Sequence, residues 1–147
     1  MKDKLENLLF FSYLTHGQID KLMPYLETLE LNAGEILFNE KEAGDCVDFI
    51  ISGSLEVIKM TSWRSFTTVA TTLREGSCIG EMTLIDHSPR PATLRAHEET
   101  KLTVLTRRAF DVMVGSEPEL AINILKGLAQ NLNLRSTTDK SGNEIAA

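Results

Sequence analysis

Residues 47–60 read Val47-Asp48-Phe49-Ile50-Ile51-Ser52-Gly53-Ser54-Leu55-Glu56-Val57-Ile58-Lys59-Met60, and this stretch decides the fold class. Two short runs rich in Val, Ile, Leu and Phe are separated by Ser52-Gly53, a pair typical of a turn. Branched and aromatic side chains favour strands because they pack well on a pleated surface. The stretch therefore predicts two consecutive strands, Val47–Ile51 and Ser54–Met60.

The same pattern of short apolar runs and glycine turns continues on both sides. Further strands or strand fragments are predicted at Glu35–Asn39, Phe66–Leu73, Ile79, Ala92–Ala96 and Lys101–Thr106, with turns at Gly34, Gly44-Asp45 and Glu75-Gly76 and a polar hairpin tip at Thr61–Ser65. Many short strands without long helices between them indicate an antiparallel sandwich or barrel rather than βαβ units. We therefore expect an antiparallel, jelly-roll-like β-barrel over about residues 31–106.

Helical periodicity precedes this region. We expect N-terminal helices over about residues 5–26, in the segments Leu5–Phe11 and Thr15–Leu26. Thr15 and Gln18 stand at the spacing of a capping box, in which each side chain bonds the other residue's backbone N–H. These helices are of the amphipathic type that packs against other elements.

Helical periodicity also follows the strands, so the fold class is mainly β with flanking α. Two C-terminal helices are expected over about residues 107–135. Ser116-Glu117-Pro118-Glu119 is a good start for the second, which we expect from Glu117 to Arg135. Its apolar stripe is expected to pack on the barrel or close over a pocket, with homodimerisation as the alternative. Residues 136–147 are expected to be a flexible tail.

Composition narrows the class of protein. The 147 residues suit a single domain, expected over residues 1–135. A net charge of −6 argues against nucleic-acid binding through the general surface. No leader and no run of about 18 apolar residues is present, so we expect a cytoplasmic protein without membrane insertion. Cys46 and Cys78 are expected to be buried free thiols rather than a disulfide.

The segment Gly80-Glu81-Met82-Thr83-Leu84-Ile85, followed by Ser88-Pro89-Arg90-Pro91-Ala92-Thr93, is the part that suggests chemistry. A cyclic phosphodiester on a ribose needs a cation and backbone N–H donors, and the ribose 2′-hydroxyl needs an acceptor such as a carboxylate. Gly80 allows close approach of the backbone, and the amides at the start of a helix over Glu81–Ile85 would form an anion site. Arg90 would supply the cation.

This segment resembles the phosphate-binding cassette of cyclic nucleotide-binding domains, which bacterial catabolite-activator-like regulators, cyclic-nucleotide-dependent kinases and gated channels share. The resemblance covers about residues 8–135 and includes the barrel turns Leu31-Asn32-Ala33-Gly34-Glu35-Ile36-Leu37-Phe38, Gly44-Asp45, Phe49–Val57 and Arg74-Glu75-Gly76, in the family's order. It implies a stand-alone regulatory module for a cyclic mononucleotide. It implies no cofactor and an effector protein that receives the signal.

The resemblance also implies residue roles. Glu81 would bind the ribose 2′-hydroxyl, Arg90 would pair with the cyclic phosphate, and backbone amides near Gly80, Met82 and Thr83 would share that phosphate. The ligand-binding candidates are Gly80, Glu81, Met82, Thr83, Arg90, Pro91 and Ala92. Many members have alanine, serine or threonine where this chain has Pro91, which lacks both an N–H and a hydroxyl. The missing hydroxyl favours cyclic AMP and leaves cyclic GMP possible.

The resemblance further implies that the last helix moves to cover the base, with Leu132, Leu134 or Arg135 as candidate base contacts. The chain ends soon after this helix, without the helix-turn-helix of the catabolite activators, so direct transcriptional control is not expected. One alternative is an interaction module that has the fold but does not bind nucleotide.

The other alternative is a metal-dependent enzyme of the cupin kind. Its ligands typically begin with His-x-His, and His16, His87 and His97 form no such pair. No metal site is therefore expected. The sequence offers no Ser/His/Asp, Cys/His or paired-carboxylate arrangement with an evident role, so we do not expect an enzyme.

Overall fold

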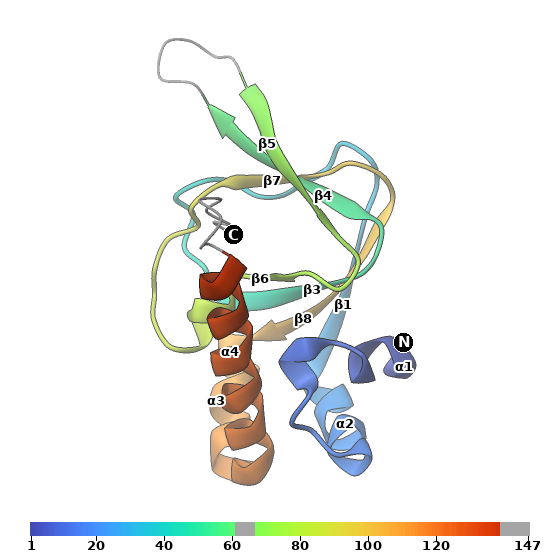
Figure 1. Ribbon diagram of the computed structural model, residues 1–147, viewed down its shortest axis with the longest axis vertical. Coiled ribbons are helices and arrows are strands. Elements are labelled where there is room, and N and C mark those ends of the chain that lie inside the picture. Colours follow the sequence, from blue (N-terminus) through green and yellow to red (C-terminus); the bar gives the residue numbers. More distant parts are fainter. Residues whose placement is uncertain (61–66, 139–147) are drawn as a thin grey trace. The chain divides into compact units, whose positions relative to one another are not determined.

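The glycine-separated apolar runs form two four-stranded sheets. The computed structural model describes residues 1–60 and 67–138. The sheets have the orders β1-β8-β3-β6 and β2-β7-β4-β5 (Figure 1), and the pairs β2–β7, β3–β6, β4–β5 and β4–β7 are antiparallel. The strands are β1 (Leu26–Leu31), β2 (Ile36–Phe38), β3 (Cys46–Ser52), β4 (Ser54–Met60), β5 (Thr67–Arg74), β6 (Cys78–Ile79), β7 (Thr93–Ala96) and β8 (Thr100–Thr106). The predicted mainly β fold with flanking helices is confirmed.

The turn in the middle of residues 47–60 carries the chain from one sheet to the other. β3 and β4 follow each other directly in sequence, yet they belong to different sheets. Gly53 makes the turn with φ 88°, and a β-carbon there would lie 2.5 Å from the carbonyl oxygen of Glu99. Only glycine fits this conformation and this space. The turn is thus a sheet-to-sheet corner.

An apolar cluster joins the two sheets. It draws side chains from both, and each member is at most 6% exposed: Leu31, Ile50, Leu55, Val57, Ile79, Ala92, Leu94, Ala96 and Leu102. Burying a large aliphatic side chain contributes about 1.5–3 kcal/mol to the free energy of unfolding. Two members, Ile79 and Ala92, bracket the segment Gly80–Pro91, so the core fixes both ends of that segment.

Strand β1 was missed by the sequence analysis, which extended a helix to Leu26. The helix ends at Leu22, a 3-10 turn with Pro24 follows, and β1 begins at Leu26. Proline within a helix removes a hydrogen bond and clashes with the preceding turn. β1 is an edge strand of which only Leu31 is buried, and its sequence Leu-Glu-Thr-Leu-Glu-Leu lacks the alternation of a half-buried strand.

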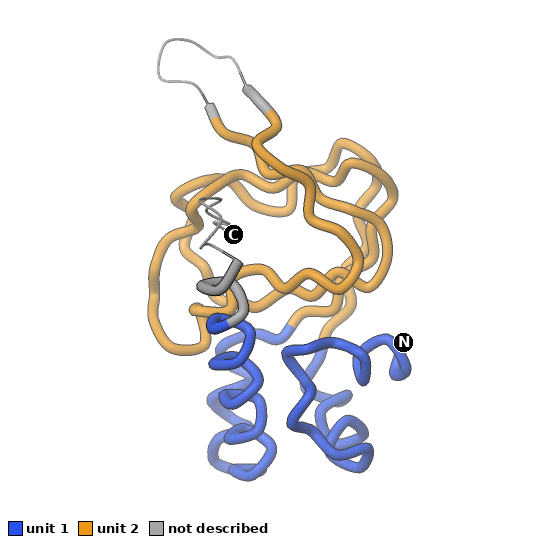
Figure 2. The backbone as a smooth tube through the Cα atoms, in the orientation of Figure 1, with its two compact units in different colours: residues 1–26, 105–146 blue, residues 27–104, 147 orange. Residues whose placement is uncertain are grey.

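The helices and the strands form two separate compact units (Figure 2). One unit comprises Met1–Leu26 and the described chain from Leu105 onward, and the other comprises Glu27–Val104. The helical elements are α1 (Lys2–Glu6), η1 (Leu9–Phe11), α2 (His16–Leu22), η2 (Met23–Tyr25), α3 (Arg107–Ser116) and α4 (Pro118–Thr138), where η denotes a 3-10 helix.

The structure confirms some of the expected helix signals and corrects others. The capping box is present, because the Gln18 amide donates to Thr15 Oγ1 at 3.1 Å and the Thr15 amide donates to Gln18 Oε1 at 3.0 Å. Leu5–Phe11 is not one helix, since α1 ends at Glu6 and a 3-10 turn follows.

Two further corrections concern the C-terminal helices. Ser116 does not cap α4, because it ends α3 and its hydroxyl donates to the Val112 carbonyl at 3.0 Å. α4 continues to Thr138, three residues into the segment expected to be a tail. The rest of that tail, the expected hairpin tip Thr61–Ser65 and Phe66 lie outside the described residues.

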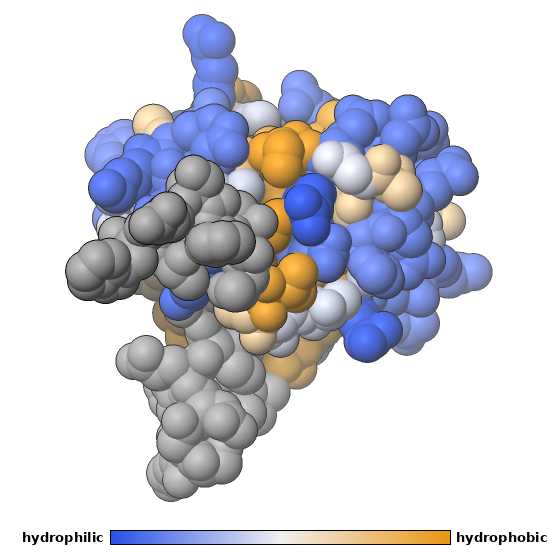
Figure 3. Space-filling model, turned by 90° about the horizontal axis from the view of Figure 1, so that it is seen from above, coloured by the Kyte–Doolittle hydropathy of each residue, from blue (hydrophilic) through white to orange (hydrophobic). Residues whose placement is uncertain are grey.

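One face of the molecule is mostly polar. In the space-filling view of Figure 3 most of it is hydrophilic, with a few hydrophobic residues gathered near the centre of the view. Among residues 1–60 and 67–138, no helix has both the length and the apolar character needed to cross a membrane.

Candidate functional site

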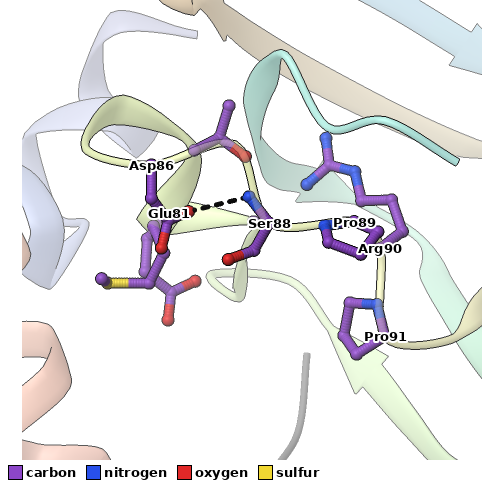
Figure 4. A pocket seen from close by; sticks show the side chains of 9 residues that line it. Glu81, Asp86, Ser88, Pro89, Arg90 and Pro91 are labelled. Carbon is purple, nitrogen blue, oxygen red and sulfur yellow. Dashed lines mark hydrogen bonds between the residues drawn. The ribbon is translucent and has the colours of Figure 1, made fainter. Parts of the chain in front are cut away.

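The segment after β6 makes a sharp turn at Gly80. Gly80 has φ 74°, in the left-handed region, and η3 (Glu81–Leu84) begins directly after it. Asp86 then accepts a hydrogen bond from the Ser88 amide at 3.1 Å (Figure 4), which tightens the loop before Pro89. The amide of Arg90 donates to the Glu42 carbonyl at 2.8 Å, so the loop is fastened to a second segment of the same unit.

η3 is shorter and tighter than the helix expected over Glu81–Ile85. It is a single 3-10 turn of four residues, too short to build up a helix dipole. The Thr83 amide donates to the Gly80 carbonyl at 3.0 Å and is thus engaged within the turn itself. Of the two amides expected in η3, the one of Met82 is therefore the better candidate for an anion.

Most of the candidate residues surround one cavity. It has a volume of about 230 Å³ and is lined by Gly80, Glu81, Met82, Thr83, Asp86, Ser88, Pro89, Arg90 and Pro91. Ala92 does not line it. Ala92 instead lines a small neighbouring cavity with Phe38, Ile79 and Leu94, which Arg90 and Pro91 also border. The six candidates other than Ala92 are thus brought together.

Glu81 and Arg90 are both almost completely buried, with 2% and 5% of their surface exposed. Their side chains do not point toward each other (Figure 4). The ion pair of Arg90 is made with Asp48, whose Oδ2 lies 3.9 Å from Arg90 Nη2. A buried carboxylate and a buried guanidinium on one short loop differ from an exposed surface ion pair, which contributes little to stability.

Arg90 is held by groups from β2 and β3. Its Nη2 donates to the Cys46 carbonyl at 2.8 Å, and its guanidinium carbon lies 4.4 Å from the centre of the Phe38 ring. A cation over an aromatic face is attracted by the ring's electron density. Asp48, Cys46 and Phe38 therefore fix the guanidinium in one place, and the sequence analysis named none of them as site residues.

Two glycines make room for this arginine. A β-carbon on Gly80 would overlap Arg90 Nη1, and one on Gly44 would lie 3.1 Å from the guanidinium carbon. The sequence analysis expected Gly80 to let a ligand approach the backbone. In the structure the bare Cα of Gly80 accommodates Arg90.

Burial governs the ionisation of the groups around Arg90. Burial raises the pKa of Asp48 to about 6, and the nearby Arg90 acts in the opposite direction. Burial, followed by the charge of Asp48, raises the pKa of the Cys46 thiol to about 12. Cys46 is therefore a neutral thiol at pH 7. Both cysteines are free, as predicted, but they are partly buried rather than buried.

A signal for the Asp48 contact was present in the sequence. Asp48 interrupts the apolar run Val47-Asp48-Phe49-Ile50-Ile51, and an acid in a buried strand requires a partner. The structure places the side chain at 1% exposure beside Arg90. From the sequence, Asp48 could thus have been proposed as the ion-pair partner of Arg90.

The candidate base contacts lie in α4. Leu132 is half-buried, and the side chains of Leu134 and Arg135 lie outside the described part of the structure. Over residues 1–60 and 67–138, no group of three or more His, Cys, Asp or Glu side chains is arranged to hold a metal ion.

Comparison with known proteins gives a consistent result. A family model described as the cyclic nucleotide-binding domain matches residues 28–117. The chain is similar to a cyclic nucleotide-binding domain from Methylobacillus flagellatus KT, with a TM-score of 0.82 and 25% identity over 95% of this chain and 82% of that one. It is also similar to the N-terminal domain of a transcriptional regulator from Streptomyces coelicolor A3(2), with a TM-score of 0.79 and 26% identity over 94% of each chain.

Among curated proteins, lysophospholipase nte1 of Neosartorya fischeri is 26% identical over 107 residues, which are 73% of this chain and 7% of that protein. The chain thus spans about 7% of the length of the curated relatives it matches. The residues matched by the family model, 28–117, include most of the two sheets, α3 and all residues that line the cavity. Since the family model covers more than half of the sequence, the chain belongs to the family of cyclic nucleotide-binding domains.

Proposed function

We propose that the cavity between Gly80 and Pro91 binds a cyclic mononucleotide, with cyclic AMP preferred to cyclic GMP, and that binding is the whole of its chemistry. Domains of this family are regulatory and non-catalytic. The observation that carries the proposal is the buried pair of opposite charges, Glu81 and Arg90, on the wall of one cavity of about 230 Å³. A ligand that carries both an anionic group and hydroxyls can bind both residues, the anion at Arg90 and a hydroxyl at Glu81.

The phosphate would be bound by Arg90 and the Met82 amide. A cyclic phosphodiester carries one negative charge, which one guanidinium matches with directional N–H donors. Arg90 Nη1 lies against Gly80, on the side where η3 begins. A phosphate placed over this turn would therefore meet both the cation and a backbone donor.

The ribose would be bound by Glu81. Its carboxylate is buried to 2% exposure and borders the same cavity, so a 2′-hydroxyl reaching it would form a charge-assisted hydrogen bond. Pro91 borders the cavity without an N–H or a hydroxyl. The absence of a hydroxyl there removes a potential contact to guanine and favours cyclic AMP.

We further propose a single sensor domain over residues 1–135 that signals to a separate effector protein. The two-state element would be α4, which would close over the base with Leu132, Leu134 or Arg135, and α4 could also form a homodimer. A ligand shifts such an equilibrium only by its difference in affinity for the two states. We place the sensor in the cytoplasm, acting without nucleic acid.

Isothermal titration calorimetry with cyclic AMP, cyclic GMP and linear 5′-AMP tests the proposal. We expect binding of the cyclic nucleotides, strongest for cyclic AMP, and at least tenfold weaker binding for Arg90→Ala and for Arg90→Lys, since lysine lacks the planar fork. Arg95→Ala is the matched control, because Arg95 lies on β7 and pairs with Glu56 at 3.4 Å. Circular dichroism checks that each variant is folded.

The alternative is an interaction module with the same fold. If the folded wild-type protein gives neither heat nor a thermal shift with millimolar cyclic nucleotide, the sensor proposal fails and this alternative stands. If Arg90→Ala binds as tightly as the wild type, the nucleotide is held elsewhere than in the cavity between Gly80 and Pro91.

A further inference from the structure

The Arg90 side chain borders two larger cavities, and in one of them it lies beside Asp48. Besides the cavity between Gly80 and Pro91, it borders a second cavity of about 310 Å³, whose wall also includes Phe38, Cys46 and Asp48. The two ends of the guanidinium face different groups. Nη2 contacts the Cys46 carbonyl and Asp48, whereas Nη1 lies against Gly80.

Phosphate binding creates a charge imbalance at this point. In the free protein the carboxylate of Asp48, 1% exposed, and the guanidinium of Arg90, 5% exposed, balance each other. A cyclic phosphate on the Nη1 side adds a second anion to the same single cation. An uncompensated buried charge is strongly unfavourable, so the site has to lose one negative charge or give up part of the contact.

We propose that Asp48 competes with the nucleotide phosphate for Arg90, so that binding is accompanied by the uptake of one proton from solvent onto the Asp48 carboxylate. This inference rests on the proposed function. It assigns to Asp48 a positioning role through Arg90 and makes the affinity of the sensor dependent on pH.

The surroundings of Asp48 support protonation within the physiological range. Its pKa already stands at about 6 in the free protein, chiefly because of burial. Arg90 is the basic group that lowers this pKa, and sharing Arg90 with a phosphate weakens that effect. The charge of Asp45 acts in the same direction as burial.

The other titratable groups near Asp48 do not offset this change. Glu27, Glu42 and the neutral thiol of Cys46 border the same cavity. Cys78 of β6 and Glu81 of η3 belong to the elements packed on β3. Lys101 of β8, the other strand beside β3, pairs with Glu30 at 3.6 Å and does not border the cavity. Apart from Arg90, none of the groups that border this cavity is basic, so the proton on Asp48 is the available compensation.

The direction of the pH effect follows from linkage. The bound state holds the proton more strongly than the free state, so affinity rises as pH falls. The dependence begins at the pKa of bound Asp48 and levels off below about pH 6, where free Asp48 is already protonated. Between these limits the association constant changes by up to about tenfold per pH unit.

The test uses the wild-type protein and cyclic AMP. Calorimetry at pH 7 in two buffers of different ionisation enthalpy counts the protons exchanged, and we expect uptake of about half to one proton per nucleotide. Titrations from pH 5 to pH 8.5 should give weaker binding above pH 6. Nucleotide binding with no proton uptake and a flat pH profile would overturn the inference and leave the proposed function intact.

Two variants assign the proton to Asp48. Asp48→Asn should bind about tenfold or more tightly than the wild type at pH 8, with no proton uptake and no pH dependence. Asp45→Asn removes a neighbouring, exposed carboxylate and should keep the proton uptake. Unchanged uptake in Asp48→Asn would overturn the assignment, whereas a wild type that binds no cyclic nucleotide at all would sink the proposed function and this inference together.

Discussion

The guanidinium of Arg90 occupies the space into which a side chain on Gly80 would project. The two residues are ten positions apart, at opposite ends of the loop that follows β6. Gly80 also has φ 74°, so two independent reasons require glycine at this position. Glycine is needed here to fit the protein's own arginine, and the position of that arginine determines the shape of the cavity.

Gly80→Ala should therefore both destabilise the protein and displace Arg90. We expect a loss of about 2 kcal/mol or more in the free energy of unfolding, and at least tenfold weaker cyclic nucleotide binding. Gly76→Ala is the matched control, because Gly76 also has positive φ, 91°, but a β-carbon there meets no atom within 4 Å. Gly76→Ala should lower the free energy of unfolding by about 1–2 kcal/mol and leave cyclic nucleotide binding unchanged. Equal effects of both substitutions on binding would contradict the role of Gly80.

The pH dependence of stability gives a second prediction, on the free protein. Burial raises the pKa of Asp48 from 3.8 to about 6, so the folded state retains a proton that the unfolded chain releases. The contribution of Asp48 to stability is thus greatest below about pH 4 and is lost as pH rises through 6. The shift corresponds to about 3 kcal/mol. Urea unfolding should show Asp48→Asn gaining about that much on the wild type between pH 4 and pH 7, and parallel pH curves would contradict this.

Local signals in the sequence were sufficient for much of the fold. Several of the strands from Ile36 onward are separated by glycine turns, and the glycines with positive φ at residues 34, 53 and 76 lie where the sequence predicted a turn. β1 was missed because an edge strand that buries only Leu31 has no buried face to mark it. The sequence predicted the turn at Gly53 but not the change of sheet there, because β3 and β4 join their sheets by pairing with strands far along the chain, β6 and β7.

The residues that line the cavity were predictable only where they lie close together in the sequence. Gly80, Glu81 and Arg90 lie in one short segment, so their spacing was enough to group them. The partners of Arg90 come from β2 and β3, more than forty residues earlier, and only the folded sheets bring Phe38 and Asp48 to it. The engagement of the Thr83 amide follows from the 3-10 geometry of η3, which sequence patterns do not distinguish from a helix.

The capping box of α2 gives a third prediction. Thr15 Oγ1 accepts the Gln18 amide at 3.1 Å, one of the donors that a helix start otherwise leaves without an intrahelical acceptor. Thr15→Ala should lower the free energy of unfolding by about 1 kcal/mol, and Thr15→Ser should restore most of it. Chemical denaturation measures both. Equal stability of the alanine variant and the wild type would show that water replaces the cap at no cost.

The fourth prediction concerns Gly127 in α4, where the same substitution should have opposite effects in two helices. A β-carbon on Gly127 would overlap the carbonyl oxygen of Phe10, so glycine here allows α4 and η1 to pack closely within the helical unit. Replacing glycine by alanine inside a helix normally stabilises it by about 0.5–1 kcal/mol. The steric clash with the Phe10 carbonyl should outweigh that gain, so Gly127→Ala should lower the free energy of unfolding by about 1–3 kcal/mol.

Gly115 in α3 is the comparison that separates the two effects. A β-carbon there meets no atom within 4 Å, so Gly115→Ala should be neutral or stabilise the protein by up to about 1 kcal/mol. Urea denaturation of both variants measures whether each substitution raises or lowers the free energy of unfolding. If Gly127→Ala were also stabilising, α4 would have to lie farther from Phe10 than the structure places it, because no flexible side chain is available to yield at a backbone carbonyl.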